Sequence, residues 1–194
     1  MLPEIPAEPC LRRISVPAFR RAVVDVCGVP GRDQMILLLS GEARDEFIGD
    51  VVGANMVWFP TRHFIAWGFA AWEGPAARTR EVMERIVRRQ FDLSYGVVRR
   101  LILHMAPPAS VIERVGPLWK RDHTAGELVA TVDEGGRGAT LHLSDSPFVD
   151  SPHGRASVAE VYRHALSLTR AKNVTETHAL DRPKRMVIRL KWTA

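Results

Sequence analysis

The strongest evidence for the fold of this chain lies in residues 127–145, ELVATVDEGGRGATLHLSD. Apolar and polar side chains alternate on both sides of a glycine-rich centre, and the apolar positions are Leu128, Ala130, Val132, Ala139, Leu141 and Leu143. A period of two is typical of strands with one buried face, and glycines between two such runs are typical of a turn. The stretch therefore predicts an antiparallel β-hairpin.

A helix and two more strands are expected after the hairpin. Ser157 and Glu160 form a capping-box pattern, and Asn173 is a plausible end for that helix. A weak strand and a Pro-containing turn follow. In the final strand we expect Met186, Ile188, Leu190 and Trp192 to face inward, with Arg185, Val187, Arg189 and Lys191 facing outward. Residues 124–194 thus predict a ββαββ unit with a four-stranded antiparallel sheet.

The chain before the hairpin has the spacing of helices. Residues 15–28 predict a helix that ends at Gly28, and helices are also expected over 31–51 and from Pro60 to Trp72. Residues 78–105 predict a long amphipathic helix, bent near residues 94–96. Residues 1–11, rich in proline, are expected to be a frayed lead-in, and residues 12–123 to be mainly helical. The prediction is one α+β domain, residues 1–194, with N-terminal helices packed on the small sheet.

Composition narrows the class of protein. The chain has 194 residues, 46% hydrophobic and 25% charged, without an uninterrupted apolar run long enough to span a bilayer. Its two cysteines fit neither a disulfide framework nor a zinc pattern. We therefore expect a cytoplasmic protein without a membrane span. The net charge of +5 is modest and concentrated in residues 61–123, so a nucleic-acid partner is not expected.

Candidate catalytic groups do not converge. In residues 116–126, GPLWKRDHTAG, Asp122 and His123 are adjacent, and neighbours on an extended chain point to opposite sides. We interpret this stretch as a hinge, with Trp119 anchoring a helix end. The remaining histidines show no metal-binding spacing, and the loop with Ser144 and His153 lacks a nucleophile motif. No catalytic residue, metal or cofactor is predicted, and an enzyme is the less favoured class.

Aromatic residues gather in one segment. Six of the fourteen aromatics lie in fifteen residues, and together with two on the long helix they form the predicted ligand-binding set: Trp58, Phe59, Phe64, Trp67, Phe69, Trp72, Phe91 and Tyr95. Such a segment is typical of the wall of an apolar cavity, of a subunit interface, or of plain core packing. We keep these three interpretations open.

Arginines recur on the long helix. Arg78, Arg89 and Arg100 are eleven residues apart, close to three helical turns, and therefore align on one face if the helix is continuous. Arg99 and Arg100 have no local carboxylate to pair with. This set, Arg78, Arg89, Arg99 and Arg100, predicts either a solvated face or a binding surface for an acidic protein partner.

Longer motifs carry a resemblance. The order WFPTRHF, RRQFDLSYGVVRRLILHMAP, GPLWKRDHTAGELVA and a final RLKW resembles a family of proteins found as multiple paralogues in myxobacteria, over about residues 16–192. That family is similar to 4-vinyl-reductase-type, haem-NO-binding-like and TRAPP-subunit-like domains. The resemblance implies a binding or regulatory module. It does not imply haem or zinc, because this chain has neither a Tyr-x-Ser-x-Arg triplet nor a cysteine cluster.

Two functional hypotheses follow from these patterns. The first is a non-enzymatic sensory or regulatory module that binds a small apolar ligand in a cavity lined by the aromatic set. The second is a homodimeric interaction or signalling protein that uses the aromatic segment 58–72 and the basic helix face. We expect a homo-oligomer or a protein partner, and under neither hypothesis does the protein catalyse a reaction.

Overall fold

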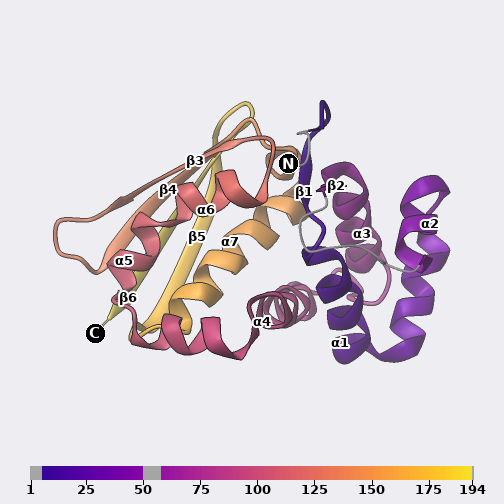
Figure 1. Ribbon diagram of the computed structural model, residues 1–194, viewed down its shortest axis with the longest axis horizontal. Helices are drawn as coiled ribbons and strands as arrows, with labels where there is room; N and C mark the ends of the chain where they lie inside the picture. The colour runs from indigo at the N-terminus through magenta and orange to yellow at the C-terminus, as the bar shows by residue number, and fades with distance from the viewer. Residues whose placement is uncertain (1–5, 50–57, 194) are drawn as a thin grey trace, which may run out of the picture. The chain divides into compact units, whose positions relative to one another are not determined.

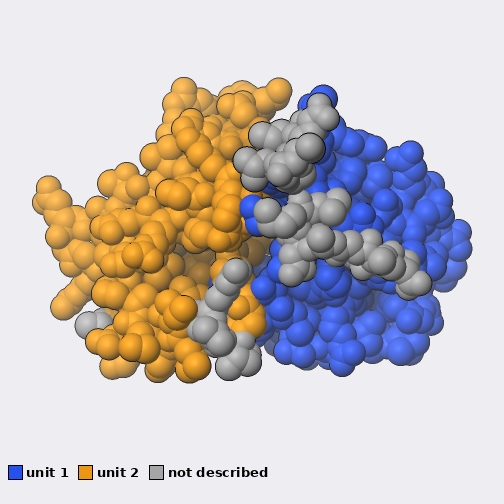
Figure 2. Space-filling view, in the orientation of Figure 1, with its two compact units in different colours: residues 1–94 blue, residues 95–194 orange. Residues whose placement is uncertain are grey.

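The computed structural model describes residues 6–49 and 58–193, with the side chains of residues 97–100 outside the described part (Figure 1). The chain divides into two compact units, whose boundary lies between Ser94 and Tyr95 (Figure 2). Both units contain helices and antiparallel strands, so the predicted α+β class is confirmed. That the whole chain forms a single domain stays a prediction.

The first unit begins with a short strand where a frayed end was expected. Strand β1 (Cys10–Arg12) pairs antiparallel with β2 (Trp58–Pro60), with Leu11 opposite Phe59. Cys10 and Leu11 are each 3% exposed. The expectation of a frayed lead-in is therefore wrong for these residues, because burial of their side chains and pairing of their backbone hold them in place.

Three helices and half of a fourth complete the first unit. They are α1 (Ser15–Leu38), α2 (Gly41–Ile48), α3 (Thr61–Glu73) and the beginning of α4 (Arg80–Met105). Helix α1 is kinked at Gly28, whose φ of 73° favours glycine, and it resumes with Pro30, which suits a first helical turn. The predicted helix end at Gly28 and the helical continuation beyond it are both confirmed. The predicted continuation to Val51 lies outside the described residues.

The second unit contains the predicted sheet. After the rest of α4 come α5 (Pro108–Glu113), α6 (Val115–Asp122), β3 (Glu127–Val132), β4 (Gly138–Ser144), a short 3-10 helix (Pro147–Asp150), α7 (Pro152–Ser167), β5 (Lys172–Arg182) and β6 (Arg185–Thr193). The strand order is β3-β4-β6-β5, and all neighbours are antiparallel. The ββαββ prediction is confirmed.

Burial alternates along the strands as the period of two predicts. Leu141 and Leu143 on β4 are fully buried, as are Met186 and Ile188 on β6. Val187 was expected to face outward but is only 4% exposed. A β-branched apolar side chain on a central strand is readily covered on its second face, so this part of the prediction is wrong.

Helices of the second unit cover the sheet. Helices α5 and α6 contact β3, whereas α7 contacts β5 and β6, as Figure 1 shows. Gly116 brings α6 close to β3, because a Cβ atom there would lie 2.8 Å from the carbonyl oxygen of Leu128. The sequence predicts a boundary at residue 124, between a helical part and a strand-containing part. The boundary between the compact units lies earlier, between Ser94 and Tyr95, so α5 and α6 belong to the same unit as the sheet.

Helix α7 begins and ends earlier than its sequence pattern indicates. The N-cap is Ser151, whose hydroxyl accepts a hydrogen bond of 3.1 Å from the backbone N–H of Gly154. Ser157 lies inside the helix, and Glu160 is buried. Asn173 belongs to β5. The capping-box and C-cap predictions are therefore wrong, because a nearer serine satisfies the first N–H groups.

Candidate ligand-binding site

The aromatic segment contributes mainly to the core of the first unit. Trp67 is fully buried, and its ring centroid lies 5.0 Å from that of Phe59, 5.1 Å from Phe47 and 6.0 Å from Phe64. The indole Nε1 donates a hydrogen bond of 2.7 Å to the carbonyl oxygen of Ala43. We call these four side chains the Trp67 cluster. Its rings fill space against one another and its indole N–H is satisfied, as in an ordinary core.

The other members of the predicted ligand-binding set lie in several environments. Phe91 is buried, Trp58 and Trp72 are partly buried, and Phe69 is 50% exposed. Tyr95 belongs to the second unit. The structure thus brings Phe59, Phe64 and Trp67 together but distributes the remaining residues over core, surface and the other unit. Ligand binding by the set stays a prediction.

The predicted arginine stripe is not continuous. Arg78 precedes α4 and forms an ion pair with Glu73, and Arg89 pairs with Asp25 at 2.7 Å. Gly96, with a φ of 63°, interrupts the helix between Arg89 and Arg100. The side chains of Arg99 and Arg100 lie outside the described residues. The alignment on one face was expected only for a continuous helix, and the kink at Gly96 means that this condition is not met.

A hollow beside Asp25 mixes both charges. Its volume is about 440 Å³, and it is lined by Asp25, Val26, Arg85, Arg88, Arg89 and Asp92. Hydrogen bonds from Arg89 and Arg21 lower the pKa of the Asp25 carboxyl, although loss of hydration opposes them. Since arginines and carboxylates here neutralise one another, the hollow has no strong preference for an ion of either sign.

A second group of rings, in the second unit, has a different character. His123 stacks on Trp119, with ring centroids 3.8 Å apart and planes only 10° apart. Phe148 meets His123 edge-on, at 6.0 Å and 86°. Trp119 is anchored by a hydrogen bond of 3.2 Å from its Nε1 to the carbonyl oxygen of Ala125. The predicted role of Trp119 as anchor of a helix end is thus confirmed.

The imidazole of His123 is neutral at physiological pH. Burial lowers its pKa from 6.5 to about 4, against the opposing influence of the Trp119 carbonyl and of Asp122. Its Nδ1 lies 3.3 Å from the carbonyl oxygen of Trp119, an acceptor, so this nitrogen carries the proton. Nε2 is consequently a hydrogen-bond acceptor, and it has no partner among the described residues.

Tyr162 on α7 adds a hydrogen-bond donor, whereas Nε2 of His123 is an acceptor. Burial raises the pKa of its phenol well above the ordinary value, and the nearby Tyr95 and Asp122 raise it further. The hydroxyl is therefore a permanent donor, and within the described part of the chain it has no hydrogen-bond partner. Both Tyr162 and His123 keep some accessible surface. Asp122 lies near both His123 and Tyr162, since its charge influences the pKa of each. We therefore group Tyr162 with the three packed rings and call Trp119, His123, Phe148 and Tyr162 the His123 cluster.

Other unpartnered polar atoms are less accessible. The Nδ1 of His63 and the Nε1 of Trp58, both in the first unit, are buried and lack a hydrogen-bond partner among the described residues. His63 Nε2 lies 3.4 Å from Glu42. Because no surface of these two nitrogens is exposed, a ligand cannot reach them in this conformation. The His123 cluster is therefore the better candidate site.

Sequence reasoning did not predict this site, although it singled out the stretch that contains Trp119 and His123. Trp119 and His123 are four residues apart, a spacing that places two side chains on one face of a helix end. The pair was nevertheless interpreted as a hinge only. Phe148 and Tyr162 come from later elements, and no local pattern connects them with His123. No group of three or more potential metal-ligating side chains occurs among the described residues.

Comparisons with known proteins identify the fold. No family model and no curated protein matches the chain. An H-NOX protein from K. algicida in the Fe(II) unliganded state has a TM-score of 0.63 at 9% identity, covering 95% of this chain and 97% of its own. An H-NOX protein from S. oneidensis in the Fe(II)NO ligation state also has a TM-score of 0.63, at 11% identity, covering 95% of this chain and 100% of its own.

A mutant H-NOX of T. Tengcongensis shows the same likeness, with a TM-score of 0.53 at 14% identity over 92% of this chain and 96% of its own. The chain therefore has the H-NOX-like α+β fold. The expected similarity to haem-NO-binding-like domains is confirmed for the fold, while the link to a myxobacterial family stays a prediction. Among the described residues, no helix is long and apolar enough to cross a membrane.

Proposed function

We propose that this protein is a sensory or regulatory module that binds a small, mainly apolar ligand at the His123 cluster. The observation that carries the proposal is the neutral imidazole of His123, held against Trp119 with an unpartnered Nε2. Sites for small molecules are typically apolar and aromatic, with a few polar groups that orient the ligand. The H-NOX-like fold of the chain supports the same class of function.

The two polar groups define the ligand's chemistry. Nε2 of His123 accepts a hydrogen bond, and the hydroxyl of Tyr162 donates one. Both groups are uncharged at neutral pH, so they favour a neutral ligand over an ion. A neutral molecule carrying one hydroxyl or carbonyl group would suit these two groups, while the buried rings of Trp119 and Phe148 hold the imidazole in place.

Haem is the ligand that the fold class suggests, since one structure of similar fold concerns heme redox potential and protein-induced porphyrin distortion. His123 has a free ring nitrogen of the kind that binds haem iron. A haem also needs partners for its two propionates, and Arg121, the neighbouring cation, is already bonded to Asp122 at 2.6 Å. The chain also lacks the Tyr-x-Ser-x-Arg triplet. The described residues thus do not fit haem, and we do not propose it.

The interaction hypothesis has weaker support. Phe59 and Trp67 are buried, so they add nothing to a surface, and Arg78 and Arg89 are already in ion pairs. Homodimerisation and an acidic partner stay predictions. Light scattering over a range of concentrations measures the oligomeric state, and a mass that rises with concentration would support the dimer.

Binding of the neutral dye Nile red, followed by its fluorescence, tests the proposed site. Nile red has a flat apolar body and a carbonyl that accepts a hydrogen bond from Tyr162. We expect Tyr162→Phe to keep the fold and raise the Kd about tenfold, the effect of losing one buried hydrogen bond. Phe69→Leu, on the exposed surface of the first unit, is the matched control and should not change the Kd.

Native mass spectrometry of the purified protein tests the same site without a dye. A bound small molecule that is retained by the wild type and lost from His123→Phe would support the proposal. A Soret band in the absorption spectrum would instead show haem and overturn our assignment. Equal dye affinities of the wild type and Tyr162→Phe would show that Nile red does not contact the cluster.

A further inference from the structure

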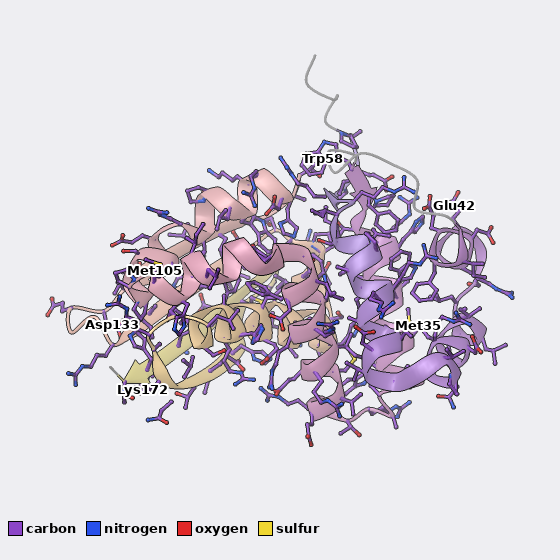
Figure 3. The ribbon with its side chains drawn as sticks, turned by 60° about the horizontal axis from the view of Figure 1, so that its bottom comes forward. Met35, Glu42, Trp58, Met105, Asp133 and Lys172 are labelled. Carbon is purple, nitrogen blue, oxygen red and sulfur yellow. The ribbon has the colours of Figure 1, made fainter. Side chains whose placement is uncertain are left out.

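A larger hollow lies at one end of the second unit, within reach of four separate segments. Its volume is about 660 Å³. The walls come from the end of α4 and start of α5, the β3–β4 turn, the connection from α7 to β5, and the end of β6. Figure 3 labels Met105, Asp133 and Lys172, which mark three of these segments. The hollow does not include any residue of the His123 cluster.

The charge of this hollow is unbalanced. Arg137, Arg170 and Lys172 line it, and no carboxylate of a described residue does. None of the three cations has an ion pair among the described residues. Asp133 and Glu134 lie in the same turn as Arg137 but are exposed and outside the lining. In the hollow of the first unit, by contrast, Asp25 and Asp92 stand among the arginines.

Hydrogen bonds fix the backbone beneath each cation. The N–H of Trp192 donates to the carbonyl oxygen of Arg137 at 3.0 Å. Thr193 Oγ1 donates to the carbonyl oxygen of Lys172 at 3.2 Å. Thr169 Oγ1 accepts a hydrogen bond of 3.1 Å from the N–H of Ala171, and thereby shapes the turn that carries Arg170. The three cations are thus attached to ordered backbone, so a ligand would order only their side chains.

The hollow also has an apolar side. Trp192 is 5% exposed and Ala171 is 8% exposed, and Pro108 completes the apolar lining. A free inorganic ion would use the cations but leave these surfaces uncovered. An anion with a flat or aliphatic body would use both kinds of surface.

We infer that this hollow binds a small organic anion, with a carboxylate, sulfonate or phosphate group among Arg137, Arg170 and Lys172 and an apolar body against Trp192. Hydrogen bonds from cations to an anion are among the stronger polar contacts in proteins. The inference is independent of the function proposed for the His123 cluster, since the two sites share no residue and favour ligands of different charge.

Titration with anilinonaphthalene sulfonate, a fluorescent aromatic anion, tests the site. We expect saturable binding by the wild type, weakened by added salt, with a Kd that rises about tenfold in Arg170→Ala and in Lys172→Ala. Arg189→Ala is the matched control: Arg189 is an exposed cation on β6, outside the hollow, and its loss should leave the Kd unchanged. The Tm of each variant shows whether it is folded.

Displacement of the bound dye by other anions shows whether affinity depends on the apolar body of the ligand as well as on its charge. Naphthoate should displace the dye at lower concentration than inorganic phosphate, because phosphate lacks the apolar body. A Kd that is unaffected in Arg137→Gln, Arg170→Ala and Lys172→Ala would overturn the inference, and so would an equal loss of affinity in Arg189→Ala. Nile red binding should stay unchanged in all four variants, so failure at this site would be distinct from failure at the His123 cluster.

Discussion

The Trp67 cluster and the His123 cluster both consist of packed rings, but they differ in their polar atoms. In the first, the indole N–H of Trp67 is bonded to Ala43 and the ring has no exposed surface. In the second, His123 and Tyr162 keep accessible surface, and each presents a polar atom without a partner among the described residues. In this chain the dense aromatic segment is therefore accounted for by core packing, and the proposed site is based on polar atoms without a partner instead.

The largest effect is expected from breaking the Trp67 cluster. Trp67→Ala removes a fully buried indole that contacts four other rings, and should lower the free energy of unfolding by about 3–5 kcal/mol. Urea denaturation measures the loss. Phe69→Ala, at a half-exposed position on the same helix, is the control and should change stability by less than about 1 kcal/mol. Similar losses in both variants would mean that the cluster is not a core.

The lowered pKa of His123 should make the free energy of unfolding depend on pH. The folded pKa of about 4 lies below the ordinary 6.5, so the unfolded chain binds a proton before the folded chain does. Stability should fall as the pH decreases from 6.5 to about 4, by a contribution on the order of 3 kcal/mol, and His123 should contribute no further loss below that.

His123→Phe isolates this contribution, because phenylalanine keeps a ring against Trp119 but does not titrate. The difference in unfolding free energy between the wild type and the variant, measured by urea denaturation from pH 4 to 7.5, should grow with pH in this window. A constant difference would show that His123 is not desolvated in the folded state.

A smaller effect is expected where α6 supports the His123 cluster on the sheet. In Gly116→Ala the new methyl group would lie 2.8 Å from the backbone oxygen of Leu128, which cannot move as a side chain can. We expect a loss of about 1–3 kcal/mol, typical of overpacking, and a lower Tm. Gly135→Ala, at an exposed turn position with no atom near the added Cβ, is the matched control. An unchanged Tm for Gly116→Ala would mean that α6 packs less closely on β3.

The smallest effect concerns the start of α7, the helix that carries Tyr162. Ser151→Ala removes the observed N-cap and should cost about 1 kcal/mol, seen as a small decrease in Tm. Ser157→Ala, at the cap position that the sequence pattern predicts, should have little effect because Ser157 lies inside the helix. A larger decrease in Tm for Ser157→Ala than for Ser151→Ala would support the predicted capping box instead.

Local regularity explains which parts of the fold the sequence predicts. The strands β3, β4 and β6 could be predicted because apolar side chains on the buried face alternate with polar ones on the other. The helix breaks at Gly28 and Gly96 could be predicted because glycine readily adopts the positive φ that both residues have in the structure. The boundary between the units was not recognisable, since it falls inside α4, where the helical spacing continues. The N-cap of α7 was misplaced because both Ser151 and Ser157 precede apolar helical spacing, and only the structure shows that Ser151 accepts the hydrogen bond from the first turn.

The candidate site was harder to predict because it is assembled from distant elements. Trp119 lies on α6 and His123 directly follows that helix. Phe148, which contacts both rings, comes from the 3-10 helix, and Tyr162, which shares Asp122 as a neighbour with His123, comes from α7. The predicted ligand-binding set relied on aromatic density, which burial accounts for equally well. Tyr95 is the exception, because it lies close enough to raise the pKa of Tyr162.

The outer strand β5 has a consequence for the solution behaviour of the protein. Its pairing with β6 is irregular between Lys172 and Thr175 and again between Leu180 and Arg182, and charged side chains stand at both ends. An irregular, charged border is a poor template for a strand from another molecule. The β5 edge is thus less suited to pairing with a strand from another molecule than a regular, uncharged edge would be.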